Sequence, residues 1–269
     1  MISDPRGEVA MLKMEGGMSA DMGGVVLLDG KGKKWRVPVG EGLVRVEGVG
    51  RVHTDHLNRM IGRSLEIGGK MYAVQQPSLR DVVETLRRKA QIIGPKDGAY
   101  IVFNCGIHAG DVVVEGGAGS GAMTIMLAHA VAPSGRILSY EARSDFLQVA
   151  QENVHRAGLA GMVDFRLGRI EDGIEAQDAK AIVLDLPEPW EAIPVAQEAL
   201  QVGGHFASYS PTMEQTRETV LSLRSHGFID VWSVELFERR LEVGRGTRPS
   251  FRMLGHTGYL TFARAARGA

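Results

Sequence analysis

An acidic residue followed by alternating glycines is the segment of this sequence best suited to chemistry. Residues 115–121 read EGGAGSG, after an apolar run at 112–114 and before a helical pattern that starts at Ala122. Glycines allow a sharp turn and a close approach of the backbone to a ligand. A carboxylate at the end of a strand, here Glu115, suits a cationic ligand better than a phosphate. S-adenosylmethionine, which carries an ammonium and a sulfonium group, meets that requirement.

A second acid follows at the spacing expected for a ribose contact. Residues 137–140 read as a strand that ends at Glu141, roughly 20 residues after the glycines. A carboxylate in this place accepts hydrogen bonds from ribose hydroxyls. The glycine spacing also fits a dinucleotide fingerprint, so these two motifs alone leave a nicotinamide cofactor open. The expected cofactor contacts in this region are Glu115, Gly117, Gly119, Ser120, Gly121 and Glu141.

A third acid stands in an unusual loop. Residues 181–184 read as a strand, and the loop at 185–190 reads DLPEPW. Two prolines stiffen this loop and hold Asp185 at the strand end. Its carboxylate can accept a hydrogen bond from the exocyclic amine of a base, which raises electron density at the neighbouring ring nitrogen. Trp190 offers a stacking face, whereas the plainer alternative makes Asp185 a helix cap and Trp190 a core aromatic.

Short apolar runs that alternate with helical patterns predict a doubly wound α/β domain with a mostly parallel sheet. The last strand, over residues 258–265, can return antiparallel to a long strand over 228–241. Ligands of such sheets bind beyond the carboxyl ends of the strands, where the three acids lie. The expected strands are 112–114, 137–140, 163–167, 181–184 and 205–208, and the expected helices are 79–90, 146–157, 194–200 and 212–227.

The sequence before this domain has a different pattern of apolar residues and glycines. Residues 23–76 contain short strands separated by glycines, which predicts a small β-rich domain resembling a barrel. Residues 77–269 then hold a linker helix and the Rossmann-like domain. Residues 1–22 are weakly patterned and form an N-terminal extension, with Met18 as an alternative start.

Composition favours a cytoplasmic protein that needs no metal. A single cysteine, Cys105, excludes an intramolecular disulfide and a multi-cysteine metal site. No apolar run approaches the ~18 residues of a membrane span, and no signal-peptide pattern opens the sequence. These features make the cytoplasm the expected location.

The charge distribution leaves two interpretations open. The net charge is −1, yet basic residues cluster in three stretches. Such patches can neutralise RNA phosphates, and they can equally be solvated surface. Because all three lie near predicted loops, we favour RNA. The stretches are Lys31, Lys33, Lys34 and Arg36; Arg80, Arg87, Arg88, Lys89 and Lys96; and Arg239, Arg240, Arg245, Arg248 and Arg252.

Four motifs together resemble the tRNA (adenine-N1)-methyltransferase family, whose members modify the T-loop adenine at tRNA position 58. The resemblance covers residues 23–266, and its two later motifs are far more specific than the glycine loop. It implies a class I S-adenosylmethionine-dependent methyltransferase fold, a tRNA substrate and a homotetramer. The motifs are residues 91–97 (QIIGPKD), the glycine loop at 115–121, the loop at 185–190, and residues 255–260 (GHTGYL).

The resemblance also implies roles for individual residues. Asp185 is the expected catalytic acceptor and lies against the methionine part of the cofactor. Either Glu171 or Asp172 faces the cofactor adenine, and Gln91 and Ile93 line its pocket. Contacts to the substrate are expected from Trp190, Arg239, Arg240, Arg245 and His256.

One departure from the family concerns Gly94, where many members have tyrosine. This departure leaves the contacts to the target base open. Modification of the adjacent position 57, which archaeal-type members carry out, also stays open. The alternative functions are a methyltransferase for a small molecule or protein, and an inactive RNA-binding subunit. Retention of the glycine loop and Asp185 favours an active enzyme.

Overall fold

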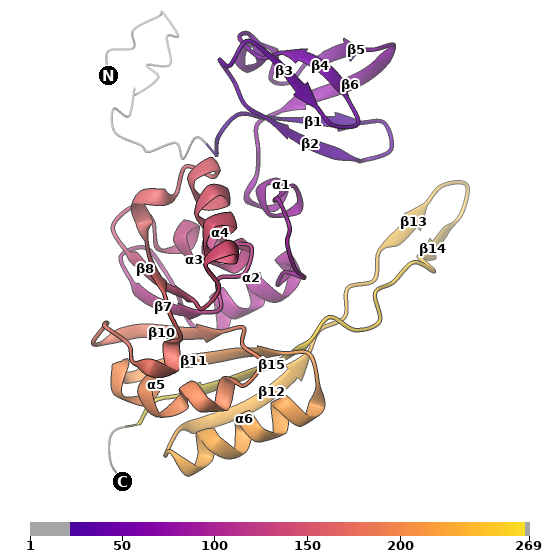
Figure 1. The fold of residues 1–269 in the computed structure, drawn as a ribbon. Helices are drawn as coiled ribbons and strands as arrows, with labels where there is room; N and C mark the ends of the chain where they lie inside the picture. Colours follow the sequence, from indigo (N-terminus) through magenta and orange to yellow (C-terminus); the bar gives the residue numbers. More distant parts are fainter. Residues whose placement is uncertain (1–21, 267–269) are drawn as a thin grey trace, which may run out of the picture.

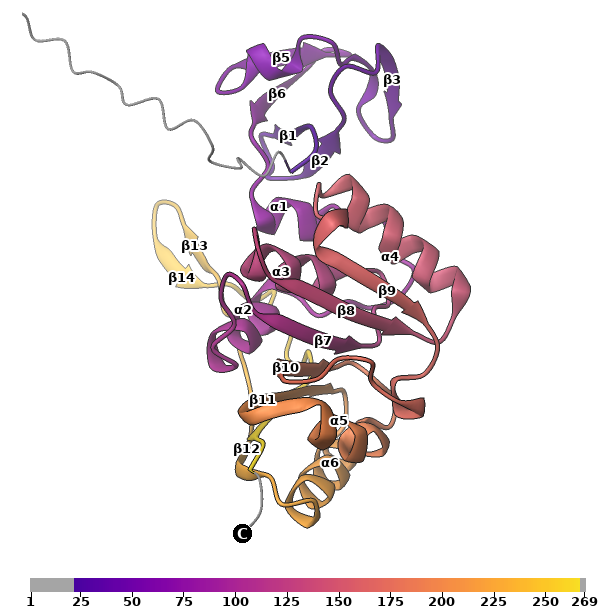
Figure 2. The same cartoon turned by 90° about the vertical axis from the view of Figure 1, so that its left-hand side faces the viewer.

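The computed structural model describes residues 22–266, and its larger part is one seven-stranded sheet with helices on both faces (Figures 1 and 2). Across the sheet the strands lie in the order β12, β15, β11, β10, β7, β8, β9. The strands are β7 (Val112–Gly116), β8 (Arg136–Glu141), β9 (Val163–Leu167), β10 (Ala179–Leu184), β11 (Leu200–Ser210), β12 (Ile229–Glu235) and β15 (Tyr259–Arg264). The helices are α2 (Pro95–Asn104), α3 (Ala122–Val131), α4 (Ser144–Arg156), α5 (Ile193–Ala199) and α6 (Met213–Ser225).

Alternation along the strands explains why both faces are covered. Val113 points into one core with α2, α3 and α4, whereas Val114 points into a second core with α5 and α6. Successive side chains of a strand face opposite sides of the sheet, so an unbroken apolar run must be covered twice.

The topology places a switch point beside β7. β8 follows β7 in the chain and pairs with one side of it, while β10 pairs with the other side, both in parallel. β15 runs antiparallel to β11 and β12. This confirms the expected α/β fold with a mostly parallel sheet and an antiparallel C-terminal strand. A crevice at the carboxyl ends of β7 and β10 follows from the reversal of strand order.

The small N-terminal region is built from two antiparallel units above the sheet (Figure 1). Its core contains Val25, Leu27, Tyr72 and Val74, which alternate along two paired strands. One unit is a four-stranded sheet in the order β2 (Lys34–Val37), β1 (Val25–Asp29), β6 (Lys70–Gln75), β5 (Ser64–Ile67). The other is the hairpin of β3 (Leu43–Val46) and β4 (Gly50–His53).

Contacts at the junction tie this region to the larger part. Lys34 pairs with both Asp81 and Glu84 of α1 (Leu79–Glu84). The predicted extension, with its alternative start at Met18, lies outside the described residues except for Met22, which is buried in the larger core.

Two predicted elements differ from the structure. The helix expected over 79–90 ends at Glu84, because backbone groups of the following residues bond to Asn153 and Ser120 instead of to each other. The long strand expected over 228–241 ends at Glu235. The chain then leaves the sheet for a projecting ribbon of β13 (Leu241–Val243) and β14 (Thr247–Pro249), drawn in yellow in Figure 1.

Helix α2 was missed because Gly98 lies in its interior. A β-carbon at Gly98 would lie 2.2 Å from the Cε atom of Met126, so the glycine lets the end of this α3 side chain pack directly against the α2 backbone. Pro95 in the first turn has the fixed φ that favours a helix start.

Candidate active site

A cleft of about 600 Å³ opens at the carboxyl ends of β7, β8 and β10. Loops after these strands, the irregular segment before α2 and the start of α6 form its walls. Its lining residues are Ala90, Gln91, Gly117, Gly119, Tyr140, Glu141, Ala142, Arg143, Gly168, Arg169, Ile170, Glu171, Asp185, Leu186, Pro187, Glu188, Pro211 and Gln215.

The glycine loop is shaped by left-handed backbone conformations. Gly117 has φ +88°, and a β-carbon there would lie 2.2 Å from the carbonyl oxygen of Asp185. Gly119 has φ +54°, and a β-carbon there would meet no atom within 4 Å, because the residue borders the cleft. The loop therefore holds Gly117 against the Asp185 backbone and presents Gly119 to a ligand.

Glu115 lies beneath the loop with only 2% of its surface exposed. Its Oε2 atom accepts hydrogen bonds from the Thr124 hydroxyl at 2.6 Å and the Ser139 hydroxyl at 2.5 Å. Its Oε1 atom has no partner among the described residues. Burial raises the pKa of Glu115 to about 7, against the opposing effect of the two hydroxyls. Its buried charge thus lacks a compensating cation.

Glu141 closes the adjoining wall and is also buried. Its Oε2 atom accepts the backbone N–H of Gly119 at 2.9 Å, and its Oε1 atom accepts from the backbone and guanidinium of Arg143 at 3.1 and 3.2 Å. Strand β8 therefore fixes this carboxylate against the glycine loop. A carboxylate oxygen has two lone pairs, so Oε2, with one donor, can accept a further hydrogen bond from a ligand.

Asp185 follows β10 and is accessible to water inside the cleft. Its backbone N–H donates to the Gly116 carbonyl at 2.8 Å, which fixes the residue beside the glycine loop. Surrounding protein and then the nearby charge of Glu141 raise the pKa of Asp185 to about 7. Because water still reaches the carboxylate, we expect a smaller rise of this pKa in solution until a ligand displaces that water.

The structure separates the two acids that the sequence left undecided. Both lie in a short 3₁₀ turn, Ile170–Asp172. Glu171 lines the cleft beside Gly168 and Arg169, whereas Asp172 lines a neighbouring hollow on the other side of that turn. Glu171 is therefore the acid that faces the same cleft as Asp185.

Sequence reasoning missed the support behind Gln91. The Gln91 side chain hydrogen-bonds the hydroxyl of Tyr209, which in turn donates to the Thr257 carbonyl. A β-carbon at Gly258 would lie 2.4 Å from the Tyr209 ring, so a glycine is required there. The C-terminal motif therefore packs against Tyr209, which supports Gln91. Gly258 was the residue in the sequence that could have indicated this close packing.

Like buried Glu115, four further predicted residues near the glycine loop and the loop after β10 lie outside the cleft lining. Ile93 is buried in the core with α3, and Trp190 packs half-buried against the core with α5. The Ser120 hydroxyl accepts the backbone N–H of Lys89 at 3.1 Å. Gly121, at φ +80°, packs against Ala150 of α4. These side chains shape the walls of the cleft from behind.

His256 makes contacts within the protein. Its Nδ1 atom lies 2.6 Å from a Glu235 carboxylate oxygen and its Nε2 atom 2.9 Å from the Pro211 carbonyl. Both partners are acceptors, so the ring is a double donor, and the contact with Glu235 raises its pKa. His256 therefore holds Pro211 at the rim of the cleft.

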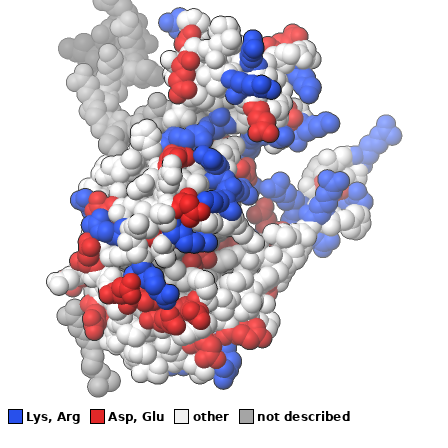
Figure 3. Space-filling view, viewed as in Figure 1, with Lys and Arg blue, Asp and Glu red and all other residues white. Residues whose placement is uncertain are grey.

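The predicted basic stretches have different environments. Figure 3 shows lysine and arginine side chains gathered where the small β region meets the larger part, and again on the projecting ribbon. Lys34 and Arg36 are engaged within the protein, and Lys96 pairs with buried Asp97 at 2.6 Å. On the ribbon, Arg240 and Arg248 pair with neighbouring glutamates. Two exposed arginines, Arg143 and Arg169, line the cleft itself, and the exposed cations Arg87, Arg88 and Lys89 directly precede the lining residue Ala90.

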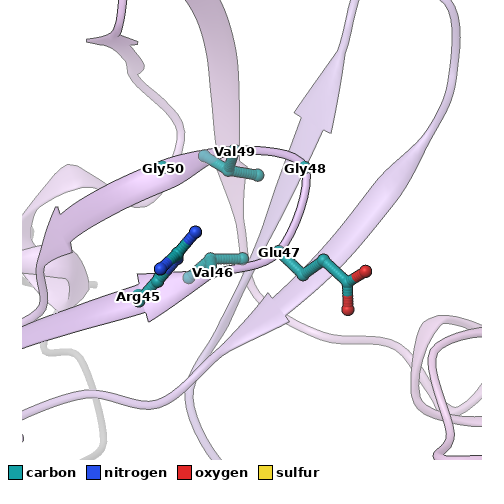
Figure 4. A pocket seen from close by; sticks show the side chains of 6 residues that line it. All are labelled: Arg45, Val46, Glu47, Gly48, Val49 and Gly50. Atoms are coloured by element: carbon teal, nitrogen blue, oxygen red, sulfur yellow. The ribbon is translucent and has the colours of Figure 1, made fainter.

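A separate hollow of about 600 Å³ lies at the turn of the β3–β4 hairpin (Figure 4). All six residues that line it come from the hairpin itself, Arg45 to Gly50. It brings together no convergent acids and does not border the glycine loop. We therefore assign the chemistry to the cleft beyond β7.

The cleft fits the expected cofactor. The carboxylates of Glu141 and Asp185 line it, the open side of Gly119 leaves room for a ligand against the backbone, and Glu115 lies buried beneath the glycine loop with one oxygen unpartnered among the described residues. In residues 22–266 no group of three or more acidic, histidine or cysteine side chains is arranged to hold a metal ion. Over the same range, no helix is long and apolar enough to cross a membrane.

Comparisons with known proteins agree with this chemistry. The family described as tRNA methyltransferase complex GCD14 subunit matches residues 71–249. The Methanocaldococcus jannaschii tRNA (adenine(57)-N(1)/adenine(58)-N(1))-methyltransferase TrmI is 34% identical over 223 residues, covering 73% of this chain and 79% of that protein.

Two solved structures share the fold. The tRNA (m1A58) methyltransferase TrmI of Aquifex aeolicus has a TM-score of 0.75 at 26% identity, covering 92% of this chain and 98% of that one. A Thermotoga maritima protein described as a SAM-dependent O-methyltransferase has a TM-score of 0.83 at 30% identity, covering 93% and 95%. These likenesses confirm the class I methyltransferase fold.

Proposed function

Because this chain belongs to the family of tRNA methyltransferase complex GCD14 subunits, we propose that it transfers a methyl group from S-adenosylmethionine to N1 of adenine-58 in the tRNA T-loop. One observation carries the chemistry: the Asp185 carboxylate faces the same cleft as the glycine loop and Glu141. A methyl donor and an amino-bearing base can therefore meet beside this acid.

The cofactor would be held by the acids and glycines of the cleft. Glu141 accepts hydrogen bonds from ribose hydroxyls, and Glu171 accepts one from the adenine amine of the cofactor. Glu115 supplies negative charge beneath the glycine loop, opposite the cationic methionine part. Bound S-adenosylmethionine supplies an electrophilic methyl group on its sulfonium.

Asp185 acts on the target base. Its carboxylate accepts a hydrogen bond from the N6 amine of adenine and so orients N1 toward the methyl group. Adenine gains a positive charge when N1 is methylated, and an ionised carboxylate beside it stabilises that charge. Leu186 and Pro187 border the same space and narrow the access of water. Positioning and charge complementarity are the main contributions of the protein.

The base must be held without the tyrosine found in many family members at the position of Gly94. A β-carbon at Gly94 would meet no atom within 4 Å, so the space beside it is open. Trp190 packs half-buried against the core with α5 and is not among the residues that line the cleft. We propose that Gln91, Pro187 and Pro211 on the cleft walls confine the base instead.

We also propose that the protein self-associates, in line with the homotetramer that the family resemblance implies. The β13–β14 ribbon and its stems expose Phe237, Leu241, Val243, Phe251 and Leu254, each at least 60% accessible. An isolated two-stranded hairpin is only marginally stable in water. A second copy that covers these side chains would stabilise the ribbon. A tRNA substrate accords with the cytoplasmic location expected from the sequence.

The test is to incubate the protein with labelled S-adenosylmethionine and an unmodified tRNA transcript, then locate the methyl group by nuclease digestion and mass spectrometry. We expect 1-methyladenosine at position 58, and the same map shows whether position 57 is modified. A transcript with another base at both positions is the control. Transfer to a small molecule or protein but not to tRNA would overturn the proposal, as would cofactor and tRNA binding without any transfer.

A further inference from the structure

Residues 86–94 form an irregular segment between α1 and α2 that faces two ways. Leu86 and Ile93 anchor its ends in the core. Between them, Arg87, Arg88 and Lys89 extend into solvent, whereas Ala90 and Gln91 line the cleft. One short stretch of backbone thus carries an exposed cationic surface and part of the cofactor wall.

A buried asparagine holds this stretch in place. Asn153 of α4 is 2% exposed, and its Nδ2 atom donates to the carbonyls of Arg87 and Ser120, each at 2.9 Å. Its Oδ1 atom accepts the backbone N–H of Arg87 at 3.3 Å. The Ser120 hydroxyl accepts the N–H of Lys89 at 3.1 Å. The segment and the glycine loop are therefore joined by the Asn153 side chain, which bonds to both, and by the Ser120 hydroxyl.

We propose that residues 86–94 couple tRNA binding to cofactor binding, and that Asn153 is the positioning residue that transmits this coupling. The inference rests on the proposed function, since it takes tRNA as the ligand of the cationic side. Phosphates bound by Arg87, Arg88 and Lys89 order the segment, which fixes Gln91 and the glycine loop for the cofactor. By linkage, bound cofactor orders the same segment for tRNA.

The surface contacts of residues 86–94 are weak enough for phosphates to replace them. Arg87 pairs with Glu152, and Lys89 pairs with Asp145, both on the outer side of α4. Within residues 22–266, the Arg88 side chain donates to the carbonyl of Glu84, at 3.3 Å. Exposed ion pairs contribute little to stability, so a phosphate replaces Glu152 or Asp145 at small cost. The buried bonds of Asn153 remain, and they carry the effect inward.

The experiment measures the affinity of S-adenosylhomocysteine, which cannot react, by calorimetry with and without saturating unmodified tRNA transcript. For the native protein we expect tRNA to tighten binding by about 5- to 150-fold, the usual range for coupled sites. In Asn153→Ala this ratio falls to about 1, because the link between the two surfaces is removed. Gln151→Ala, at an exposed position of the same helix, keeps the native ratio.

A second variant guards against a folding defect. Ser120→Ala removes only the hydroxyl that accepts from Lys89, and it should lower the ratio while the thermal midpoint stays close to native. Equal affinities with and without tRNA in the native protein would overturn the coupling but leave methyl transfer to tRNA standing. A native ratio in both variants would overturn the role of Asn153. Absence of both tRNA binding and transfer would overturn the proposed function as well.

Discussion

Glu115 and Asp185 show at the residue scale how the fold prepares a site for positive charge. Glu115 lies near the end of β7 and Asp185 directly follows β10, and the surrounding protein raises the pKa of each to about 7. Water in the cleft offsets part of this effect for Asp185, but Glu115 is fully enclosed. A carboxylate that loses hydration without gaining a partner favours its neutral form. A cationic ligand or product reverses that preference.

Cofactor affinity should therefore rise with pH between about 5.5 and 7, by up to about tenfold for each pH unit. The cation binds the ionised form of Glu115, so binding at lower pH must first remove a proton. In Glu115→Gln the slope should shrink to the part that Asp185 contributes. Calorimetric titration with S-adenosylhomocysteine, whose ammonium group remains, provides the measurement. Equal affinity of the native protein at both ends of this range would contradict it.

For the ligand-free protein, the raised pKa of Glu115 makes the free energy of unfolding fall with pH, whereas it makes cofactor affinity rise. The folded pKa of Glu115 lies above its ordinary value of 4.5. Between these two values the folded chain binds more protons than the unfolded chain, so the free energy of unfolding falls as pH rises through that window. Glu115→Gln should remove this part of the pH dependence.

At the element scale, the loop after β7 separates a structural glycine from a ligand-facing one. Gly117→Ala should destabilise the fold, because its β-carbon would collide with the Asp185 carbonyl at a positive φ. Gly119→Ala should cost only ~1–2 kcal/mol of conformational strain and yet weaken cofactor binding, since its β-carbon enters the cleft. Thermal melts and cofactor titration distinguish the two effects.

Gly161→Ala, which would meet no neighbouring atom, is the control for these glycine variants. Loss of cofactor binding is expected in Gly119→Ala with the thermal midpoint nearly retained. If Gly119→Ala binds the cofactor as the native protein does, the glycine loop does not contact the cofactor as predicted.

The elements that the sequence predicted well are those with strong local signals. The helix expected from residue 212 starts there as α6, with a capping box of Thr212 and Gln215, and the strand over 258–265 returns antiparallel as β15. Helix α1 ends earlier than predicted because Asn153 bonds to the backbone of Arg87, and just after the end of strand β12 the Lys96 side chain bonds to the carbonyl of Leu236. Periodicity along the chain cannot register such contacts.

The site residues also divide into those with a clear signal in the sequence and those whose position depends on the folded structure. Glu141 and Asp185 line one cleft because parallel strands end at one edge of the sheet, which sequence order alone implies. Trp190, in contrast, turns into the core because Pro189–Ala192 forms a 3₁₀ turn, and its side chain packs toward α5. The choice between Glu171 and Asp172 also depends on one short turn, whose direction the sequence does not encode locally.

At the scale of the whole molecule, the projecting ribbon should mediate self-association. Leu241→Glu and Val243→Glu place charges on side chains that are 64% and 78% exposed, so they should leave the monomer fold intact and dissociate the assembly. Val202→Glu, at an exposed valine on β11, is the matched control. Sedimentation velocity measures the outcome. A native protein that sediments as a monomer, or variants that sediment as the native protein does, would contradict this assignment.

The ribbon should also contribute to tRNA affinity. Replacing Arg239, Arg240 and Arg245 with alanine should weaken tRNA binding and flatten its salt dependence by about one unit of slope for each phosphate that is no longer neutralised. Cofactor affinity in the absence of tRNA should remain native. Arg217→Ala on α6 is the control. Unchanged tRNA affinity over a range of salt concentrations, with the assembly intact, would identify these arginines as solvated surface.

The most direct test of the proposed methyl transfer compares the native protein with Asp185→Asn in single-turnover reactions with tRNA, at saturating cofactor. The asparagine keeps the shape but loses the charge that stabilises methylated adenine. We predict 1-methyladenosine at position 58 from the native protein and a rate lower by about 100- to 1,000-fold in the variant, with the fold retained. Transfer by the variant at the native rate, or a methyl group placed elsewhere than N1 of adenine, would contradict this mechanism.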